Sequence, residues 1–203
     1  MRAEPRRVGL WIERALLATG IFSLVWWGVV SLNASLYQHT QRAVLERTRG
    51  EAYPPNSRVE VLNTGSLVGS IDIPRLGLSA VIAEGDDEAT LKVAVGHLPD
   101  TPLPGDTGNS ALAGHRDTFF GPLQHIRVGD QVRVSTPRGD FHYQVRETMV
   151  VGPDDVWVLD PTDRPMLTLI TCHPFNYVGK APRRFIVRAE RPISGNPEVE
   201  TGG

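Results

Sequence analysis

The sequence predicts an all-β domain, either a small closed barrel or a sandwich, preceded by one apolar N-terminal helix. Between about residue 65 and residue 191, seven or eight short apolar runs alternate with turn sequences, which is typical of these folds. The 16 prolines and 20 glycines supply the many turns that such an architecture requires. None of the predicted strands carries the charged side chains of an exposed sheet edge, and this favours the closed barrel.

The N-terminal helix is predicted over residues 15–38, where no Lys, Arg, Asp, Glu or His occurs. About 20 apolar residues cross the hydrocarbon core of a bilayer as a helix. Four arginines lie within residues 1–14, so the positive-inside tendency places this segment in the cytoplasm and the rest of the chain outside. We therefore expect an uncleaved, single-pass signal-anchor. The alternatives are a signal peptide cleaved near residues 33–35 (NAS) and the buried helix of a soluble protein.

The segments that flank the folded domain are polar. Residues 41–53 are compatible with a solvated continuation of the anchor helix, which Pro54 and Pro55 would end. We expect residues 39–64 to form a linker and residues 192–203, rich in Pro, Gly and Glu, to form a disordered tail.

The domain at residues 65–191 shows mostly strand signals. A short helix is predicted over residues 88–95, with Asp86 or Asp87 as its N-cap, and a helical turn over residues 119–126. Strands are predicted at residues 68–73, 78–82, 96–98, 109–114, 131–135, 141–151, 167–172 and 185–187, with residues 136–140 as a hairpin turn.

Composition limits the possible functions. The chain has 203 residues, of which 40% are hydrophobic, and this is sufficient for one domain with a true core. Its net charge of −2 argues against a nucleic-acid binder, because surfaces that track phosphates need a clustered positive excess. Cys172 is the only cysteine, so the chain has no internal disulfide and carries a free thiol.

Three residues at predicted strand ends carry the groups that acyl transfer through a thioester requires. Cys172 ends one apolar run, His115 follows another, and Arg184 opens a third. A thiolate is the nucleophile in this chemistry, a histidine can hold and return the proton, and an arginine can stabilise an oxyanion. On spacing alone, however, a single cysteine on an apolar strand is more often a small buried hydrophobe.

The choice between the adjacent Arg183 and Arg184 follows from strand alternation. Phe185, Val187 and Ala189 make the better core face. Alternation then places Arg184 on the opposite face, where the site is expected, and gives Arg183 the wrong parity.

His115 is the preferred histidine because it stands at a strand end before a polar turn. His173 adjoins Cys172, but neighbours on a strand face opposite sides, which makes it a poor base. His97 could line the site or serve in packing. The other three histidines lie in the membrane flank, a turn and an alternating strand, where solvated or capping roles are expected.

Residues 168–172 (TLITC) match the Thr-Leu-x-Thr-Cys motif of sortases, the membrane-anchored bacterial cysteine transpeptidases. Residues 113–120 (AGHRDTFF) resemble the segment that carries the family's histidine, and residues 181–187 (APRRFIV) resemble the path to its arginine. Two further segments are similar to the class D and class E branches, namely residues 71–76 (IDIPRL) and 96–99 (GHLP). The similarity extends in order over about residues 65–190.

The resemblance implies a closed eight-stranded β-barrel with its site in a groove. It implies Cys172 as the nucleophile, His115 as general acid and base, and Arg184 as the oxyanion and substrate-binding residue. The implied reaction cleaves a C-terminal LPxTG-like sorting motif after Thr, through a thioester, and passes the acyl group to an amine. His173 departs from the family pattern, because related chains often carry an aromatic or polar residue there.

The resemblance also implies the partners and the location. The partners would be exported proteins with a sorting motif, an amine acceptor of the cell envelope or a pilin lysine, and the lipid bilayer of the bacterial cytoplasmic membrane. No cofactor is expected. The alternative functions are a hydrolytic cysteine peptidase and a catalytically inactive barrel that binds peptides.

A metal site is not expected. Four aspartates could offer oxygen ligands to calcium, but aspartates beside prolines in loops are usually turn formers; they are Asp154, Asp155, Asp160 and Asp163.

Overall fold

The computed structural model describes residues 5–48, 62–177 and 179–192, and the chain divides into two compact units, Met1–Tyr37 and Gln38–Gly203. Residues 49–61, which are half of the predicted linker, and the predicted tail from residue 193 onward lie outside the described residues.

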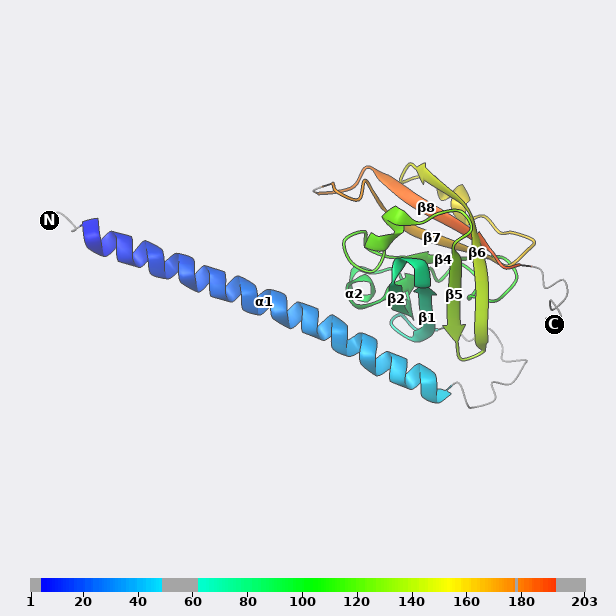
Figure 1. The fold of residues 1–203 in the computed structure, drawn as a ribbon, viewed down its shortest axis with the longest axis horizontal. Helices are drawn as coiled ribbons and strands as arrows, with labels where there is room; N and C mark the ends of the chain where they lie inside the picture. The colour runs from blue at the N-terminus through cyan, green and yellow to red at the C-terminus, as the bar shows by residue number, and fades with distance from the viewer. Residues whose placement is uncertain (1–4, 49–61, 178, 193–203) are drawn as a thin grey trace, which may run out of the picture. The chain divides into compact units, whose positions relative to one another are not determined.

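Helix α1 (Pro5–Thr48) contains the predicted apolar segment and extends beyond it at both ends (Figure 1). The part Trp11–Arg47 is long and apolar enough to cross a membrane, and its most apolar stretch has a mean hydropathy of 1.9. Trp11, Trp26 and Trp27 are each exposed by more than 60%. A helix in the core of a soluble domain would bury such side chains, so α1 is a candidate membrane anchor. It continues through Thr48, as predicted, but this part is not simply solvated, because Leu45 is only 4% exposed and Arg42 donates to the hydroxyl of Ser79 at 2.8 Å.

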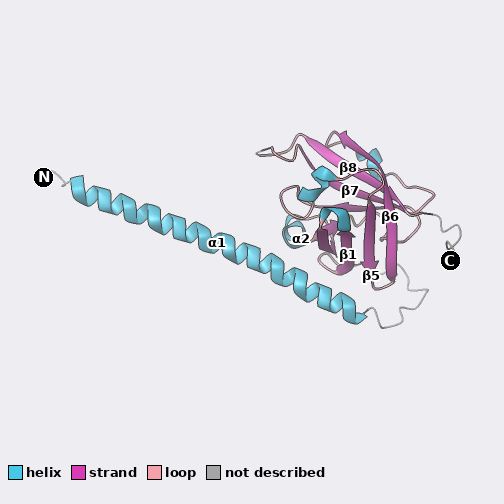
Figure 2. Ribbon diagram, viewed as in Figure 1, coloured by secondary structure: helices cyan, strands magenta, loops and turns pink. Residues whose placement is uncertain are grey.

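The second unit contains a closed eight-stranded barrel, which confirms the predicted fold (Figures 1 and 2). Around the barrel the strand order is β1-β2-β3-β4-β7-β8-β6-β5. The pairs β2–β3 and β4–β7 are parallel and the remaining pairs are antiparallel. The strands are β1 (Leu67–Ile73), β2 (Leu78–Glu84), β3 (Val95–His97), β4 (Asn109–Ala113), β5 (Gln131–Thr136), β6 (Gly139–Val151), β7 (Met166–His173) and β8 (Arg183–Glu190).

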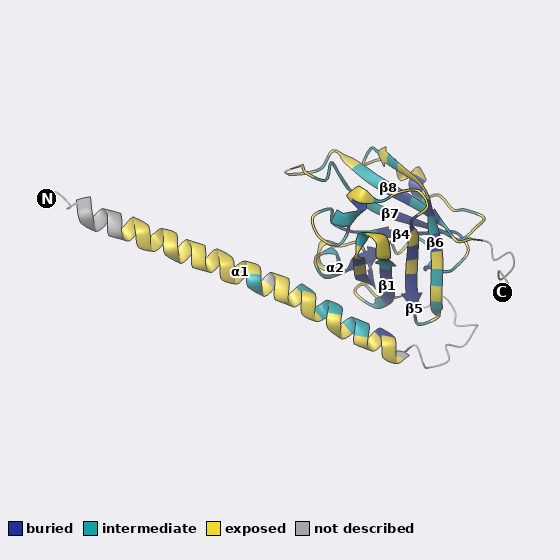
Figure 3. Cartoon of the chain, viewed as in Figure 1, coloured by how far each residue is buried: buried dark blue, intermediate teal, exposed yellow. Residues whose placement is uncertain are grey.

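Buried and exposed residues alternate along barrel strands such as β5 (Figure 3). Val132 and Val134 of β5 are fully buried, whereas Arg133 between them is exposed. Leu167 and Leu169 of β7 meet them in the same core cluster. Because strand side chains have a period of two, each strand has one face inside the barrel and one face available for a site.

Short helical segments join the strands: η1 (Pro74–Leu76), α2 (Glu88–Val93), η2 (Gly121–His125) and η3 (Val156–Leu159). Helix α2 is the crossover between the parallel strands β2 and β3, as such connections require. Its N-cap is Asp87, one of the two predicted caps, whose carboxylate accepts the N–H groups of Ala89 and Thr90 at 2.9 and 3.2 Å.

The barrel closes where β1 meets β5, and a glycine permits this approach. Ser70 of β1 pairs with Ser135 of β5. A Cβ atom on the preceding Gly69 would lie 2.2 Å from the carbonyl oxygen of Ser135. Any larger residue would therefore have to displace the backbone at the closing seam.

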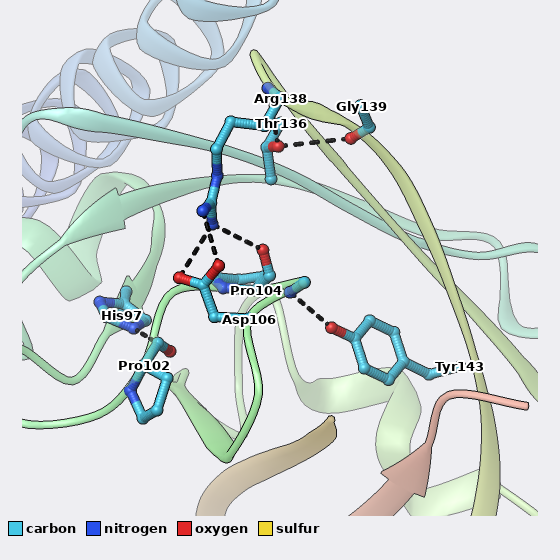
Figure 4. A network of polar contacts seen from close by, with 9 residues as sticks. His97, Pro102, Pro104, Asp106, Thr136, Arg138, Gly139 and Tyr143 are labelled. Atoms are coloured by element: carbon cyan, nitrogen blue, oxygen red, sulfur yellow. Dashed lines mark hydrogen bonds and ion pairs between the residues drawn. The ribbon is translucent and has the colours of Figure 1, made fainter. Parts of the chain in front are cut away.

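The loop between β3 and β4 is fastened to the β5–β6 hairpin (Figure 4). Arg138 forms an ion pair with Asp106 at 2.6 Å and donates to the carbonyl of Pro104 at 3.2 Å. The buried hydroxyl of Tyr143 accepts the N–H of Gly105 at 2.8 Å. These contacts hold the loop against the β5–β6 hairpin.

Candidate active site

Cys172 and Arg184 lie opposite each other on neighbouring strands. They pair directly in the β7–β8 ladder, and Arg183 pairs with the residue that follows Cys172. Opposed residues of an antiparallel pair project to the same face. The pair Leu169 and Val187, three positions away, is completely buried in the core, so the Cys172–Arg184 pair faces outward. In this register Arg184, and not Arg183, lies directly opposite Cys172.

His115 comes level with Cys172 because the chain beyond β4 stays attached to β7. The N–H of Gly114 donates to the carbonyl of Ile170 at 3.1 Å, and the hydroxyl of Thr171 donates to the carbonyl of Gly114 at 2.7 Å. Strands β4 and β7 run parallel, so continuing their register past Gly114 places His115 next to Cys172.

The backbone of His115 is fixed on its other side by a tight turn. Its carbonyl accepts the N–H groups of Thr118 and Phe120 at 3.3 and 3.1 Å. The buried ring of Phe120 packs so closely under the chain that a Cβ atom on Gly114 would lie 2.7 Å from it. Gly114 therefore lets the chain pass close to the ring of Phe120, and the next residue, His115, lines the pocket.

The three predicted catalytic side chains line one pocket of about 230 Å³ on the outer face of β7 and β8. Its lining contains three basic side chains and one carboxylate, an excess of positive charge that favours the negative charge developing in acyl transfer. The lining residues are His115, Arg116, Asp117, Cys172, Gly179, Lys180, Ala181 and Arg184.

The guanidinium of Arg184 is anchored by the chain that leads into β8. Its Nη1 donates to the carbonyl of Ala181 at 3.4 Å and to that of Arg183 at 3.1 Å. Both contacts use the same nitrogen, so the part of the chain that the structure describes leaves Nε and Nη2 of Arg184 available for a ligand. Arginine offers five N–H donors and keeps its charge at all physiological pH values.

Two basic side chains of the pocket, Arg116 and Lys180, were not singled out by the sequence argument. Arg116 directly follows His115 in the AGHRDTFF segment, and its side chain binds the loop between β7 and β8. Lys180 belongs to the same loop. The position of Arg116 beside the histidine was a usable signal, but its partners are distant in sequence and no local pattern identifies them.

The side chain of His173 turns away from Cys172, as strand alternation predicts. Its ring stacks on Phe185 with a centroid distance of 6.3 Å and meets Phe175 edge-on at 6.0 Å. Both phenylalanines pack against the barrel core. His173 therefore caps the end of the core and is not placed to serve Cys172.

His97 serves in packing, the second of the two roles considered for it. It is 1% exposed, and its Nδ1 lies 2.7 Å from the carboxylate of the equally buried Glu84. Its Nε2 lies 3.1 Å from the carbonyl of Pro102, as Figure 4 shows. These contacts tie β2, β3 and the loop after β3 together.

A carboxylate of α2 lies within electrostatic reach of the predicted base. The pKa of Glu88 is lowered chiefly by a hydrogen bond from Lys92, at 2.8 Å, then by the charge of Lys92, and in smaller part by attraction to His115.

The aspartates considered for calcium have structural contacts. The carboxylate of Asp155 accepts the N–H of Gly152 at 2.6 Å, which forms a turn. Across residues 5–48, 62–177 and 179–192, no three acidic, histidine or cysteine side chains gather in a way that could hold a metal ion.

Comparison with known proteins gives a consistent result. The family model described as a sortase domain matches residues 71–192. Sortase D of Bacillus subtilis (strain 168) is 37% identical over 129 residues, which cover 63% of this chain and 65% of that relative. Sortase SrtE1 of Streptomyces coelicolor is 28% identical over 188 residues, covering 80% of this chain and 52% of the relative. The chain thus spans between half and two thirds of the length of these curated relatives.

Comparison with solved structures also identifies sortases. A Clostridium perfringens sortase D5 transpeptidase has a TM-score of 0.65 and 27% identity, and the match covers 78% of this chain and 97% of that one. Sortase C1 of Streptococcus agalactiae has a TM-score of 0.60 and 33% identity over 69% of this chain and 74% of that one. The similarity to sortases D agrees with the class D resemblance of the sequence. The chain, with its closed barrel and its Cys172 pocket, belongs to the sortase family.

Proposed function

We propose that this protein is a cysteine transpeptidase that forms a thioester with a sorting-motif peptide and transfers the acyl group to an amine. The observation that supports this most directly is that Cys172, His115 and Arg184 line one outward-facing pocket. These residues supply a nucleophile, a proton carrier and a fixed cation, one from each of three neighbouring chain segments.

In the first half-reaction, the thiolate of Cys172 attacks the carbonyl carbon of the scissile peptide bond. The carbonyl electrons move onto oxygen, where the guanidinium of Arg184 stabilises the negative charge. When the carbonyl re-forms, the C–N bond breaks and protonated His115 gives its proton to the leaving amine. The products are a thioester on Cys172 and a free amine.

In the second half-reaction, an acceptor amine attacks the thioester carbon. His115, now neutral, takes the proton that the amine loses. The C–S bond breaks, Cys172 leaves as a thiolate, and a new amide is formed. If water attacked in place of the amine, the same steps would describe the alternative function, a hydrolytic peptidase.

The proposed donor substrate is an exported protein with an LPxTG-like C-terminal motif, cleaved after Thr. The proposed acceptor is an amine of the cell envelope or a pilin lysine. We further propose that α1 holds the enzyme in the cytoplasmic membrane with its N-terminus inside and the barrel outside, where both substrates would be met.

The test is to incubate the full chain, in detergent, with a library of peptides that carry LPxTG-like motifs, with and without an added amine. We expect Cys172 to gain the mass of the peptide segment that ends in Thr. The added amine should then convert the adduct into an amide. The Cys172→Ala variant should form neither product.

The outcomes separate the candidate functions. Release of a free acid at a rate that the amine does not affect would support the hydrolytic peptidase. Binding of peptides without any adduct on Cys172 would support the inactive peptide-binding barrel. Either result would overturn the transpeptidase proposal.

A further inference from the structure

The side chain of Arg116 contacts three backbone carbonyls of one loop. Nη1 donates to Pro174 at 3.0 Å, and Nη2 donates to Tyr177 at 2.6 Å and to Gly179 at 3.0 Å. The guanidinium carbon also lies 6.0 Å from the centre of the Tyr177 ring, within cation–π distance. All three acceptors belong to the loop of residues 174–182, which joins β7 to β8.

This loop forms one wall of the pocket. Gly179, Lys180 and Ala181 line the pocket beside Cys172. The carbonyl of Ala181 also accepts a hydrogen bond from Arg184. The position of the loop therefore sets both the shape of the pocket wall and one anchor of the guanidinium that is proposed to bind the oxyanion.

The described part of this loop, residues 174–177 and 179–182, has little backbone hydrogen bonding of its own. The hydrogen bond between backbone groups within its described part joins the N–H of Tyr177 to the carbonyl of Pro174, at a long 3.4 Å. Gly179 has a φ of +100°, a conformation that glycine adopts freely and other residues resist. A charged side chain that binds three carbonyls at once supplies the restraint that strand pairing does not.

The chemistry of the contact suits arginine in particular. The guanidinium is planar and presents several N–H donors in a fixed fork, so one side chain can serve several carbonyls. The ammonium of a lysine is a compact charge on a flexible stem and cannot reproduce that fork. Arg116 is also bonded in the chain to His115, so the same residue that holds the loop is tied to the predicted base.

We propose that Arg116 is a positioning residue, which holds the β7–β8 loop over Cys172 and thereby fixes the pocket wall and Arg184 for the reaction. The proposal rests on the transpeptidase function proposed above. Arg116 does not act on the reacting atoms. Its loss therefore leaves the thiol intact and displaces the groups that surround the substrate.

The experiment compares Arg116→Ala and Arg116→Lys with the unchanged full chain in detergent. We expect Arg116→Ala to lower kcat/KM for peptide transfer by about 100-fold, with a higher KM and a lower kcat, because small displacements of positioned groups cost about that much. The kcat/KM of Arg116→Lys should lie between that of Arg116→Ala and that of the unchanged chain. Cys172 should still be modified by a small alkylating reagent, which shows that the thiol itself is intact.

A second readout follows the loop directly. Lys180 is exposed and precedes Ala181, so trypsin can cut the loop there when it is mobile. We expect faster cleavage after Lys180 in Arg116→Ala, measured by mass spectrometry. The matched control is Arg133→Ala, a half-exposed arginine of β5 whose ion pair to Asp72 is 4.0 Å long. It should behave as the unchanged chain in every assay.

The results distinguish a failure of the role proposed for Arg116 from a failure of the proposed transpeptidase function. Unchanged kcat/KM together with unchanged cleavage after Lys180 would overturn the role of Arg116. If the unchanged chain performs no transfer, the proposed function fails, while cleavage after Lys180 still tests the restraint on the loop. If Arg116→Ala does not fold, Arg116→Lys decides, and a lysine variant that matches the unchanged chain in both assays overturns the proposal.

Discussion

Arg183 and Arg184 carry the same side chain one residue apart, and the β7–β8 ladder gives them different surroundings. Arg184 pairs with Cys172, and its guanidinium lines the pocket. Arg183 is exposed, and the pocket is formed without it. Comparing the two therefore tests the site at the scale of one residue, with charge and composition held constant.

We predict that Arg184→Ala lowers kcat for transpeptidation by about 10²–10³-fold, the usual cost of removing one donor to an oxyanion. Arg183→Ala should leave kcat nearly unchanged. Steady-state transfer of a labelled peptide to an amine measures both. Equal losses in the two variants would contradict the assignment of the oxyanion group to Arg184.

At the scale of the elements, an ion pair joins two turns on one side of the barrel. Arg75 of η1 binds the carboxylate of Asp130 with both Nε and Nη2, each at 2.5 Å, and also donates to the carbonyl of His125 at 2.6 Å. Asp130 accepts the N–H of Arg127 at 2.8 Å. The side chain of Asp130 is only 7% exposed, so the turn before β5 depends on this pair.

The pair makes stability depend on pH. The hydrogen bond from Arg75 is the main reason that the pKa of Asp130 lies below its usual value, although burial opposes the shift. A carboxyl whose pKa is lower in the folded state stabilises the fold above its unfolded pKa of about 3.9. That contribution is lost as the pH falls from there through the folded pKa.

We predict that Asp130→Asn lowers the free energy of unfolding at pH 7 by about 1–3 kcal/mol, because the buried carboxylate that accepts hydrogen bonds from Arg75 and Arg127 becomes a neutral amide. The variant should also lose less stability than the unchanged chain between pH 5 and pH 2. Urea unfolding across this pH range measures both effects. Asp154→Asn, at an exposed loop residue, is the control, and an identical pH slope for Asp130→Asn and the unchanged chain would contradict the prediction.

At the scale of the whole molecule, the chain combines an exposed apolar helix with a barrel that carries a free thiol. Cys172 is the only cysteine of the sequence. Thiol labelling therefore reports on which side of the membrane the barrel lies, without any engineered site.

We predict that a maleimide that cannot cross membranes labels Cys172 in intact cells, because the arginines before the apolar segment favour an inside N-terminus. Cys172→Ala should take up no label. Asp154→Cys in that background supplies an exposed thiol elsewhere on the barrel, in case the pocket hinders the reagent. Labelling of both thiols only after lysis would place the barrel inside the cell.

Much of the fold was predictable because it depends on local patterns. The alternation of Val132 and Val134 with polar neighbours predicted β5, and an Asp at the start of residues 88–95 predicted the capped helix α2. The predicted helix extended two residues too far, since Ala94 and Val95 leave the helix for an extended conformation and β3. Strand pairing at this position outweighs the helical propensity of these two residues.

What the sequence by itself determined is the set of elements, the parity of Arg184 and the family motifs around Cys172 and His115. Each of these depends on residues close together along the chain, where periodicity and turn chemistry act. Only the tertiary structure decided that His97 belongs to the packing, that His173 caps the core, and that Arg116 restrains the pocket wall. The carbonyls that Arg116 binds lie 58 to 63 residues away from it. Contacts over such distances arise from the register of the closed barrel, which brings β4, β7 and β8 side by side.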